Sequence, residues 1–186
     1  MIMNSKKLAI ILPGTGYHKD KPLLYYATKL AIQAGYDIQH VNYLEFFENI
    51  NYRAPEMAEA ADKAFAKAEK VLGALDFSQY TDVVFIGKSF GTVVASIYVE
   101  EHKLSASQIW YTPVIETFDH PSKDVIAFTG TKDPIADTGL LREKADKFDI
   151  PLHIYEDANH SLETGDAIKD LETLQAVMQI TKEKLS

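Results

Sequence analysis

The segment VVFIGKSFGT, at positions 83–92, places a serine between two glycines directly after an apolar run. A serine hydroxyl is a weak nucleophile at neutral pH, and it needs an adjacent base and a site that stabilises the developing oxyanion. A sharp turn between a strand and a helix can present such a serine above a sheet, provided that its neighbours are small. Ser89, between Gly87 and Gly91, is therefore the candidate nucleophile. The alternative is a glycine-rich turn with an N-capping serine.

The base and the acid that orients it are expected in loops after later strands, in the chain order serine, acid, histidine. Of the six histidines, only His160, in YEDANHSLE, lies in a loop directly after a late strand, so it is the predicted base. The segment GTKDPIAD holds two acid candidates. Asp133, which precedes Pro134, is the predicted acid, although an Asx turn would use the same residues. Asp137 is the competitor, nearer the next helix.

Two loops could supply the donors of an oxyanion hole. A helix beginning near Phe90 would point its free amides at the serine, so the Phe90 N–H is one predicted donor. The second is expected in the PGTGY segment after the first strand, where glycines allow a close backbone approach. Thr15 is the predicted residue, with Gly16 or Tyr17 as alternatives. We also predict that Gly16, Tyr17 and His18 contact the substrate.

These candidates need a scaffold of alternating strands and helices. Short apolar or alternating runs predict six strands, within 6–14, 36–43, 82–87, 107–114, 124–130 and 151–158. Helical spacing predicts helices from Pro22 to Gly35, from Pro55 to about 75, over 91–103, over 140–148, and after an N-cap at Asp166. This alternation predicts an α/β fold: a three-layer, doubly wound, mainly parallel six-stranded sheet covered by helices on both faces.

In the common strand order 2-1-3-4-5, the winding direction reverses between strands 1 and 3, and ligands bind beyond the carboxyl ends at that point. The first strand ends in PGTGY and the third in GKSFG. The two glycine-marked loops are therefore expected to face each other across the switch point.

Composition limits the remaining possibilities. A chain of 186 residues is expected to form a single domain over 1–186. The net charge of −8 argues against nucleic acid or an anionic membrane as partner, and the absence of cysteine excludes disulfides and thiolate metal sites. The apolar run near the N-terminus is too short for a signal peptide or a membrane span, so a cytoplasmic protein is expected. No cofactor or metal is expected, and the oligomeric state is left open.

Together these segments resemble the α/β-hydrolase family over nearly the whole chain. GKSFG is similar to its nucleophile elbow, GTKDPI to its acid loop and ANHSLE to its histidine loop. The resemblance implies that Ser89 is the nucleophile, Asp133 the acid and His160 the base.

The sequence departs from the family pattern at two positions and in length. Pro13 stands where the oxyanion loop usually has histidine, and Lys88 precedes the nucleophile where many members have histidine or another residue. The short interval between Ser89 and Asp133 leaves no room for a cap domain. The chain therefore resembles the small, lidless bacterial serine hydrolases and dienelactone-hydrolase-like proteins.

The predicted function is carboxylesterase-like hydrolysis of a small or medium ester through an acyl-enzyme on Ser89. Thioesters and amides use the same machinery and stay open as alternatives, as does a scaffold that has kept the triad. A different class, a non-catalytic flavodoxin-like module holding phosphate in PGTGY, is the other alternative. It has weaker support, because Gly14-x-Gly16 lacks the third glycine of the dinucleotide-binding pattern.

Overall fold

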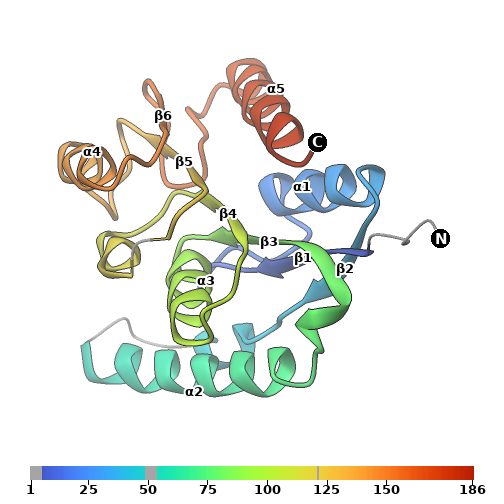
Figure 1. Cartoon of the computed structure of the whole chain (residues 1–186). Coiled ribbons are helices and arrows are strands. Elements are labelled where there is room, and N and C mark those ends of the chain that lie inside the picture. The colour runs from blue at the N-terminus through green and yellow to red at the C-terminus, as the bar shows by residue number, and fades with distance from the viewer. Residues whose placement is uncertain (1–5, 49–53, 121) are drawn as a thin grey trace.

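The computed structural model describes residues 6–48, 54–120 and 122–186 (Figure 1). Its sheet consists of β1 (Lys6–Leu12), β2 (Tyr36–His40), β3 (Tyr80–Lys88), β4 (Ser107–Tyr111), β5 (Val125–Gly130) and β6 (Leu152–Tyr155). The strands are arranged in the order β2-β1-β3-β4-β5-β6, and every neighbouring pair is parallel. The predicted doubly wound order is confirmed, so the loops that follow β1 and β3 are neighbours at the carboxyl edge.

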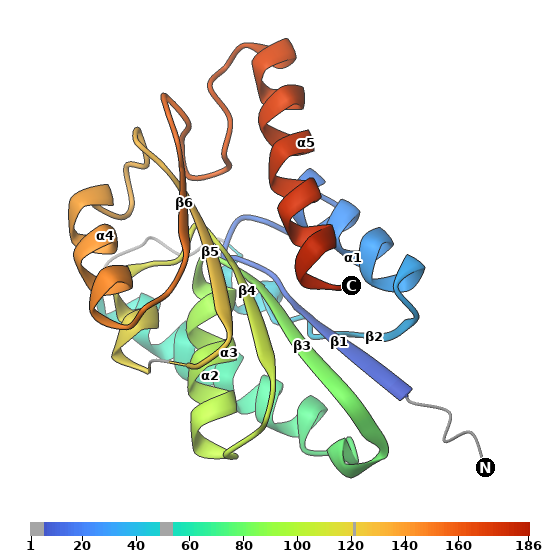
Figure 2. The ribbon, with the colours of Figure 1, turned by 45° about the horizontal axis from the view of Figure 1, so that its top comes forward.

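The helices are α1 (Pro22–Gln33), α2 (Ala54–Leu72), α3 (Phe90–Glu101), α4 (Thr138–Lys147) and α5 (Ala167–Lys184). Three short 3₁₀ helices, η1 (Leu44–Phe47), η2 (Phe77–Gln79) and η3 (Ile115–Asp119), complete the described elements. Figure 2 shows α1 and α5 together on one side of the sheet and α2, α3 and α4 on the other. This is the predicted three-layer architecture. Within the described ranges, no further domain is inserted between the strands, and no helix is long and apolar enough to cross a membrane.

The strands are apolar on both faces because helices cover both. In β3, Phe85 belongs to the core against α2 and α3, whereas Val84 and Ile86 belong to the core against α1 and α5. Successive side chains of a strand point to opposite faces, so each face receives every second residue. The continuous apolar runs in the sequence are typical of such a doubly covered parallel sheet.

Glycine lets α3 begin directly against the backbone of the sheet. A Cβ added at Gly91 would lie 2.3 Å from the carbonyl oxygen of Leu12, and one added at Gly87 would lie 2.7 Å from that of Gly91. No side chain fits at either position without moving the backbone. The first turn of α3 is therefore packed onto the ends of β1 and β3, and this close packing fixes the position of Ser89 between them.

We expect Gly91→Ala to lower the free energy of unfolding by roughly 3 kcal/mol, because the new methyl group would collide with backbone that cannot rotate away. For a chain of this size, that loss corresponds to a melting temperature lower by roughly 6–12 °C. Gly16→Ala is the matched control, since a Cβ there meets no atom within 4 Å. Thermal unfolding followed by circular dichroism measures both. Equal melting temperatures for the two variants would contradict the packing described above.

Candidate active site

Ser89 lies at the junction of β3 and α3 in an unusual backbone conformation, with φ 52° and ψ −121°. A non-glycine residue at positive φ is strained and needs support from its surroundings. Here the Ser89 N–H donates to the Tyr111 carbonyl oxygen over 2.9 Å, and the Thr92 N–H donates to the Ser89 carbonyl over 2.8 Å. The Ser89 side chain makes no capping hydrogen bond to α3. Its hydroxyl faces a histidine instead, which argues against the capping alternative.

His160 lies in the loop between β6 and α5 and contacts both other sequence candidates. Its Nε2 is 2.7 Å from Ser89 Oγ, and its Nδ1 is 2.7 Å from Asp133 Oδ2. The Thr112 hydroxyl holds the loop by donating to the His160 carbonyl oxygen over 3.0 Å. With Nδ1–H donated to the carboxylate, Nε2 is left to accept the serine proton. The structure thus brings the three residues into one hydrogen-bonded chain.

The Asp133 side chain is fully buried at the end of β5. Its second oxygen, Oδ1, accepts hydrogen bonds from the amides of Ile135 (2.8 Å) and Ala136 (3.3 Å). Burial by itself would raise the pKa of Asp133, but the hydrogen bonds from His160 and these amides outweigh it and keep the pKa below its ordinary value. Asp137 lies elsewhere: its carboxylate accepts from the Leu140 amide (2.9 Å) and caps α4.

The loop after β1 is a tight turn beside Ser89. The Tyr17 N–H donates to the Gly14 carbonyl oxygen and the Gly14 N–H donates back to Tyr17, both over 3.1 Å. The amide of Tyr17 is therefore engaged and is excluded as the second oxyanion donor. The amides of Phe90, Thr15 and Gly16 have no acceptor among the described residues. The Phe90 amide thus stays available, and Thr15 and Gly16 both stay open as the second donor.

Tyr17 and His18 point in different directions from this turn. The Tyr17 ring is buried beside Ser89, and its hydroxyl accepts from the Leu23 amide over 3.0 Å. Burial raises the pKa of Tyr17 to about 12. His18 is half exposed, accepts from the Asp20 amide through Nδ1, and is not among the residues that line the cavity. The structure therefore places Tyr17, but not His18, where a substrate could contact it.

A cavity of about 740 Å³ opens beside Ser89 and His160. One wall is apolar and comes from α2, α3 and the segment after β4: Met57, Ala61, Phe65, Phe90, Val93 and Val114. Polar and charged side chains also reach it: Thr15, Tyr17, Lys21, Lys88, Glu116 and Ser161. Sequence reasoning did not find the apolar wall, because the apolar spacing of α2 is also that of an ordinary core-facing helix.

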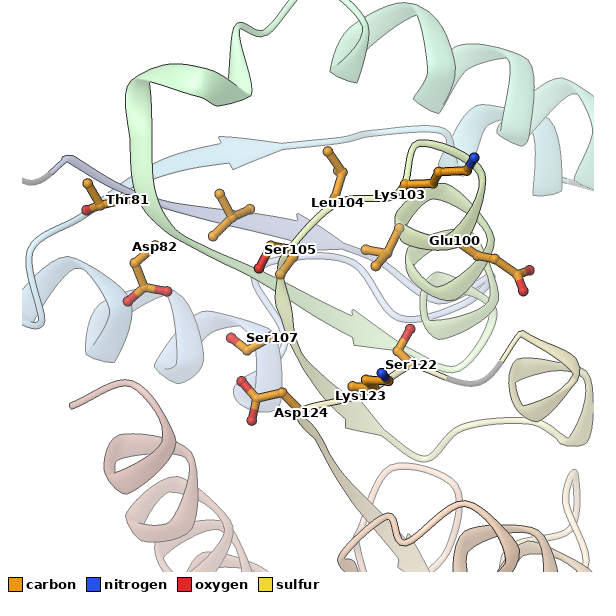
Figure 3. Close-up of a pocket in the computed structure, with 13 residues that line it drawn as sticks. Thr81, Asp82, Glu100, Lys103, Leu104, Ser105, Ser107, Ser122, Lys123 and Asp124 are labelled. Atoms are coloured by element: carbon orange, nitrogen blue, oxygen red, sulfur yellow. The ribbon is translucent and has the colours of Figure 1, made fainter.

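A second cavity, of about 450 Å³, lies at the opposite edge of the sheet (Figure 3). Figure 3 shows Thr81 and Asp82 near the start of β3, Ser107 at the start of β4 and Asp124 before β5. Ligands of parallel α/β sheets bind beyond the carboxyl ends of the strands, so the cavity at Ser89 is the candidate active site. Among the described residues, no group of three or more His, Asp or Glu side chains could hold a metal ion.

Lys88 is a buried cation in the wall of the candidate site. It is 1% exposed, and no described residue forms a hydrogen bond or an ion pair with its ammonium group. Its Nζ lies 5.1 Å from the centroid of the Tyr17 ring, and Nζ of Lys21 lies at the same distance from that ring. Burial lowers the pKa of Lys88 to about 7; the negative charge of Asp133 opposes this effect and the positive charge of Lys21 adds to it.

Comparison with known proteins identifies the fold. No protein-family model and no curated protein sequence matches the chain. A serine hydrolase without a lid from Xanthomonas campestris matches 96% of this chain and 80% of its own, with a TM-score of 0.69 and 13% identity. An α/β serine hydrolase homologue from Coxiella burnetii matches 98% and 86%, with a TM-score of 0.66 and 15% identity. A Pyrococcus furiosus esterase matches 99% and 85%, with a TM-score of 0.66 and 14% identity. The chain therefore has the α/β-hydrolase fold, in its lidless form.

We expect Lys88→Met to stabilise the protein, because it keeps most of the side-chain length and removes a desolvated ammonium group. One pKa unit corresponds to about 1.4 kcal/mol, so the free energy of unfolding should rise by about 2–4 kcal/mol at pH 7. Between pH 7, near the pKa of Lys88 in the folded protein, and pH 10.5, its ordinary pKa, the unfolded chain binds more protons than the folded protein does. The gain should therefore be largest below pH 7 and shrink as the pH approaches 10.5.

Urea unfolding at pH 7 and pH 9.5 measures this gain. Lys29→Met is the matched control, since Lys29 also lies over a tyrosine ring, that of Tyr25, but on the exposed surface of α1. It should change the free energy by less than about 0.5 kcal/mol at either pH. A loss of stability in Lys88→Met would mean that the ammonium has a partner in solution.

Proposed function

We propose that this protein is a serine hydrolase that cleaves a small or medium ester through an acyl-enzyme on Ser89. The observation that carries the proposal is the hydrogen-bonded chain from Asp133 through His160 to the Ser89 hydroxyl, with both contacts at 2.7 Å. The lidless α/β-hydrolase fold supports it, because a serine hydrolase from Xanthomonas campestris and an esterase from Pyrococcus furiosus have similar folds.

In the proposed reaction, Ser89 Oγ attacks the ester carbonyl while His160 Nε2 takes the hydroxyl proton. The carbonyl oxygen becomes an oxyanion, which accepts hydrogen bonds from the amides of Phe90 and Thr15. Collapse of this intermediate breaks the bond to the alcohol, which leaves with the proton held by His160. Water then loses a proton to the same histidine, attacks the acyl-enzyme, and releases the carboxylic acid.

Asp133 has an orienting role in this scheme. Its carboxylate accepts from His160 Nδ1, which keeps the tautomer that can serve as base, and it stabilises the imidazolium that forms. Two backbone amides hold the carboxylate in place. Its lowered pKa keeps it ionised at neutral pH, as this role requires.

The cavity favours an acyl substrate over the phosphate of a flavodoxin-like module. Its apolar wall from α2 and α3 suits a hydrocarbon group. A phosphate-binding loop would not need a serine hydroxyl within hydrogen-bond distance of a histidine. Thioesters and amides fit the same machinery, so matched butyryl ester, thioester and amide substrates should be compared. We place the ester ahead of the amide, because an alcohol is an easier leaving group than an amine.

We expect Ser89→Ala to remove covalent labelling by a fluorophosphonate probe and to lower kcat for 4-nitrophenyl butyrate by a factor on the order of 10⁵–10⁶. Alanine removes the nucleophile without adding bulk to the packed turn. The matched control is Ser105→Ala, an exposed serine at the opposite edge of the sheet, which should keep labelling and turnover. Labelling that persists in Ser89→Ala would assign the nucleophile to another residue.

Asp133→Asn should lower kcat by a factor on the order of 10⁴, because the amide would favour the wrong tautomer of His160. Asp137→Asn should lower it by less than about tenfold, since asparagine also caps a helix and Asp137 does not contact His160. Steady-state kinetics with 4-nitrophenyl butyrate compares the two. The reverse ranking would move the orienting role to Asp137.

A further inference from the structure

Lys88, whose ammonium has no partner among the described residues, is not used by the proposed hydrolytic mechanism. Burying a charge is costly unless it is paired and hydrogen-bonded, and long lysine side chains usually reach solvent instead. Within the described ranges no carboxylate lies close enough to pair with Lys88, and the residue is only 1% exposed. The side chain lines the cavity that also holds Ser89 and His160.

A second cation reaches the same part of the cavity. Nζ of Lys21 and Nζ of Lys88 each lie 5.1 Å from the centroid of the Tyr17 ring, and all three side chains line the cavity. An aromatic ring attracts cations but cannot neutralise them. Both side chains therefore place their amines over the same tyrosine ring at the cavity wall, where a carboxylate would be needed to neutralise them.

The nearby acidic groups leave this charge largely uncompensated. Asp133 is engaged by His160 and two backbone amides. Glu163 is exposed beyond Tyr17. Glu116 also lines the cavity, but it belongs to η3, which packs with the α4 side of the sheet, whereas Tyr17 packs with the α1 side.

We propose that Lys88 and Lys21 form a subsite for a carboxylate carried by the substrate, so that the enzyme acts on anionic half-esters. That this ligand is a substrate rests on the proposed hydrolase function. The carboxylate would accept a charge-assisted hydrogen bond from Lys88 Nζ, and the apolar part of the molecule would lie against the α2 wall. Such a bond would give the ammonium a partner that the described residues do not provide.

Proton uptake gives this subsite a signature that a purely structural lysine would not show. The pKa of Lys88 is lowered to about 7, so at pH 7.5 much of its amine is neutral, and a bound carboxylate would raise that pKa and draw in a proton. Other ionisable groups face the same region: Lys21, Tyr17, Asp133, His160, Glu116 and Glu163. The proton uptake due to Lys88 is therefore the uptake measured with Lys88 present minus the uptake measured in the Lys88→Met variant.

Binding can be measured without turnover in the Ser89→Ala variant by isothermal titration calorimetry at pH 7.5. The probes are two half-esters and their neutral methyl esters. Methyl hydrogen glutarate carries its carboxylate on the acyl side, and butyryloxyacetate carries it on the alcohol side. Titration in two buffers of different ionisation enthalpy gives the number of protons taken up.

We expect at least one half-ester to bind roughly 10- to 100-fold more tightly than its neutral partner, with uptake of a fraction of a proton. Adding Lys88→Met should abolish most of that preference and that uptake, and Lys21→Met should reduce the preference less. Lys29→Met, the exposed lysine over Tyr25, is the matched control and should keep both. Equal affinity for charged and neutral esters, or a preference that survives Lys88→Met, would overturn the subsite.

Hydrolysis of the same esters by the protein with Ser89 intact, followed by acid release, separates the two proposals. Charge preference in binding without hydrolysis of any ester would support the subsite and reject the hydrolase function. Hydrolysis of both members of each pair with equal kcat/KM would support the hydrolase function and reject the subsite.

Discussion

The close approach of α3 to the backbone of β1 and β3 is the constraint on which the candidate site depends. At Gly91 and Gly87 the approach leaves no space for a Cβ, so helix and strands meet backbone to backbone. The connection between them has to turn within one residue, and that residue, Ser89, adopts a positive φ. Packing on both sides maintains this strained conformation, and a folded protein can thereby keep a side chain in a preorganised position.

Hydrogen bonds connect the Ser89 turn to the neighbouring loops along the carboxyl edge of the sheet. The Ser89 amide donates to the end of β4 at Tyr111, and the next residue, Thr112, donates its amide to Phe128 of β5 and its hydroxyl to the carbonyl of His160. The acid loop is attached to the histidine loop in turn, through the Lys132 amide and the Ala158 carbonyl oxygen. Ser89, His160 and Asp133 come from three different strand ends, yet each loop is fixed to the next by backbone bonds.

Much of this arrangement could be predicted from the sequence, because it follows from patterns that are local. Apolar runs of strand length predicted the six strands, and the common doubly wound order predicted that the loops after the first and third strands would meet. The glycines around Ser89 and the chain order of Asp133 and His160 predicted which later loops would join them. The engagement of the Tyr17 amide could not be predicted, because it depends on how a four-residue turn closes on itself. The apolar cavity wall was missed, because a helix face that lines a cavity has the same spacing as one that fills a core.

The surroundings of Lys88 are a further feature of the site that the sequence could not predict. Lys88 continues the row of Val84 and Ile86, which face the α1 side of the sheet, so a third apolar residue would fit the pattern. The type of the residue can be read in the sequence, but the absence of a partner for it among the residues that the structure describes cannot. Because Ser89 lies at the sheet edge, the cavity beside it has an apolar side from α2 and α3 and a cationic side from Lys21, before α1, and Lys88, at the end of β3. A bond cleaved at Ser89 would lie at the boundary of the two, with a hydrocarbon group on one side and a negative charge on the other.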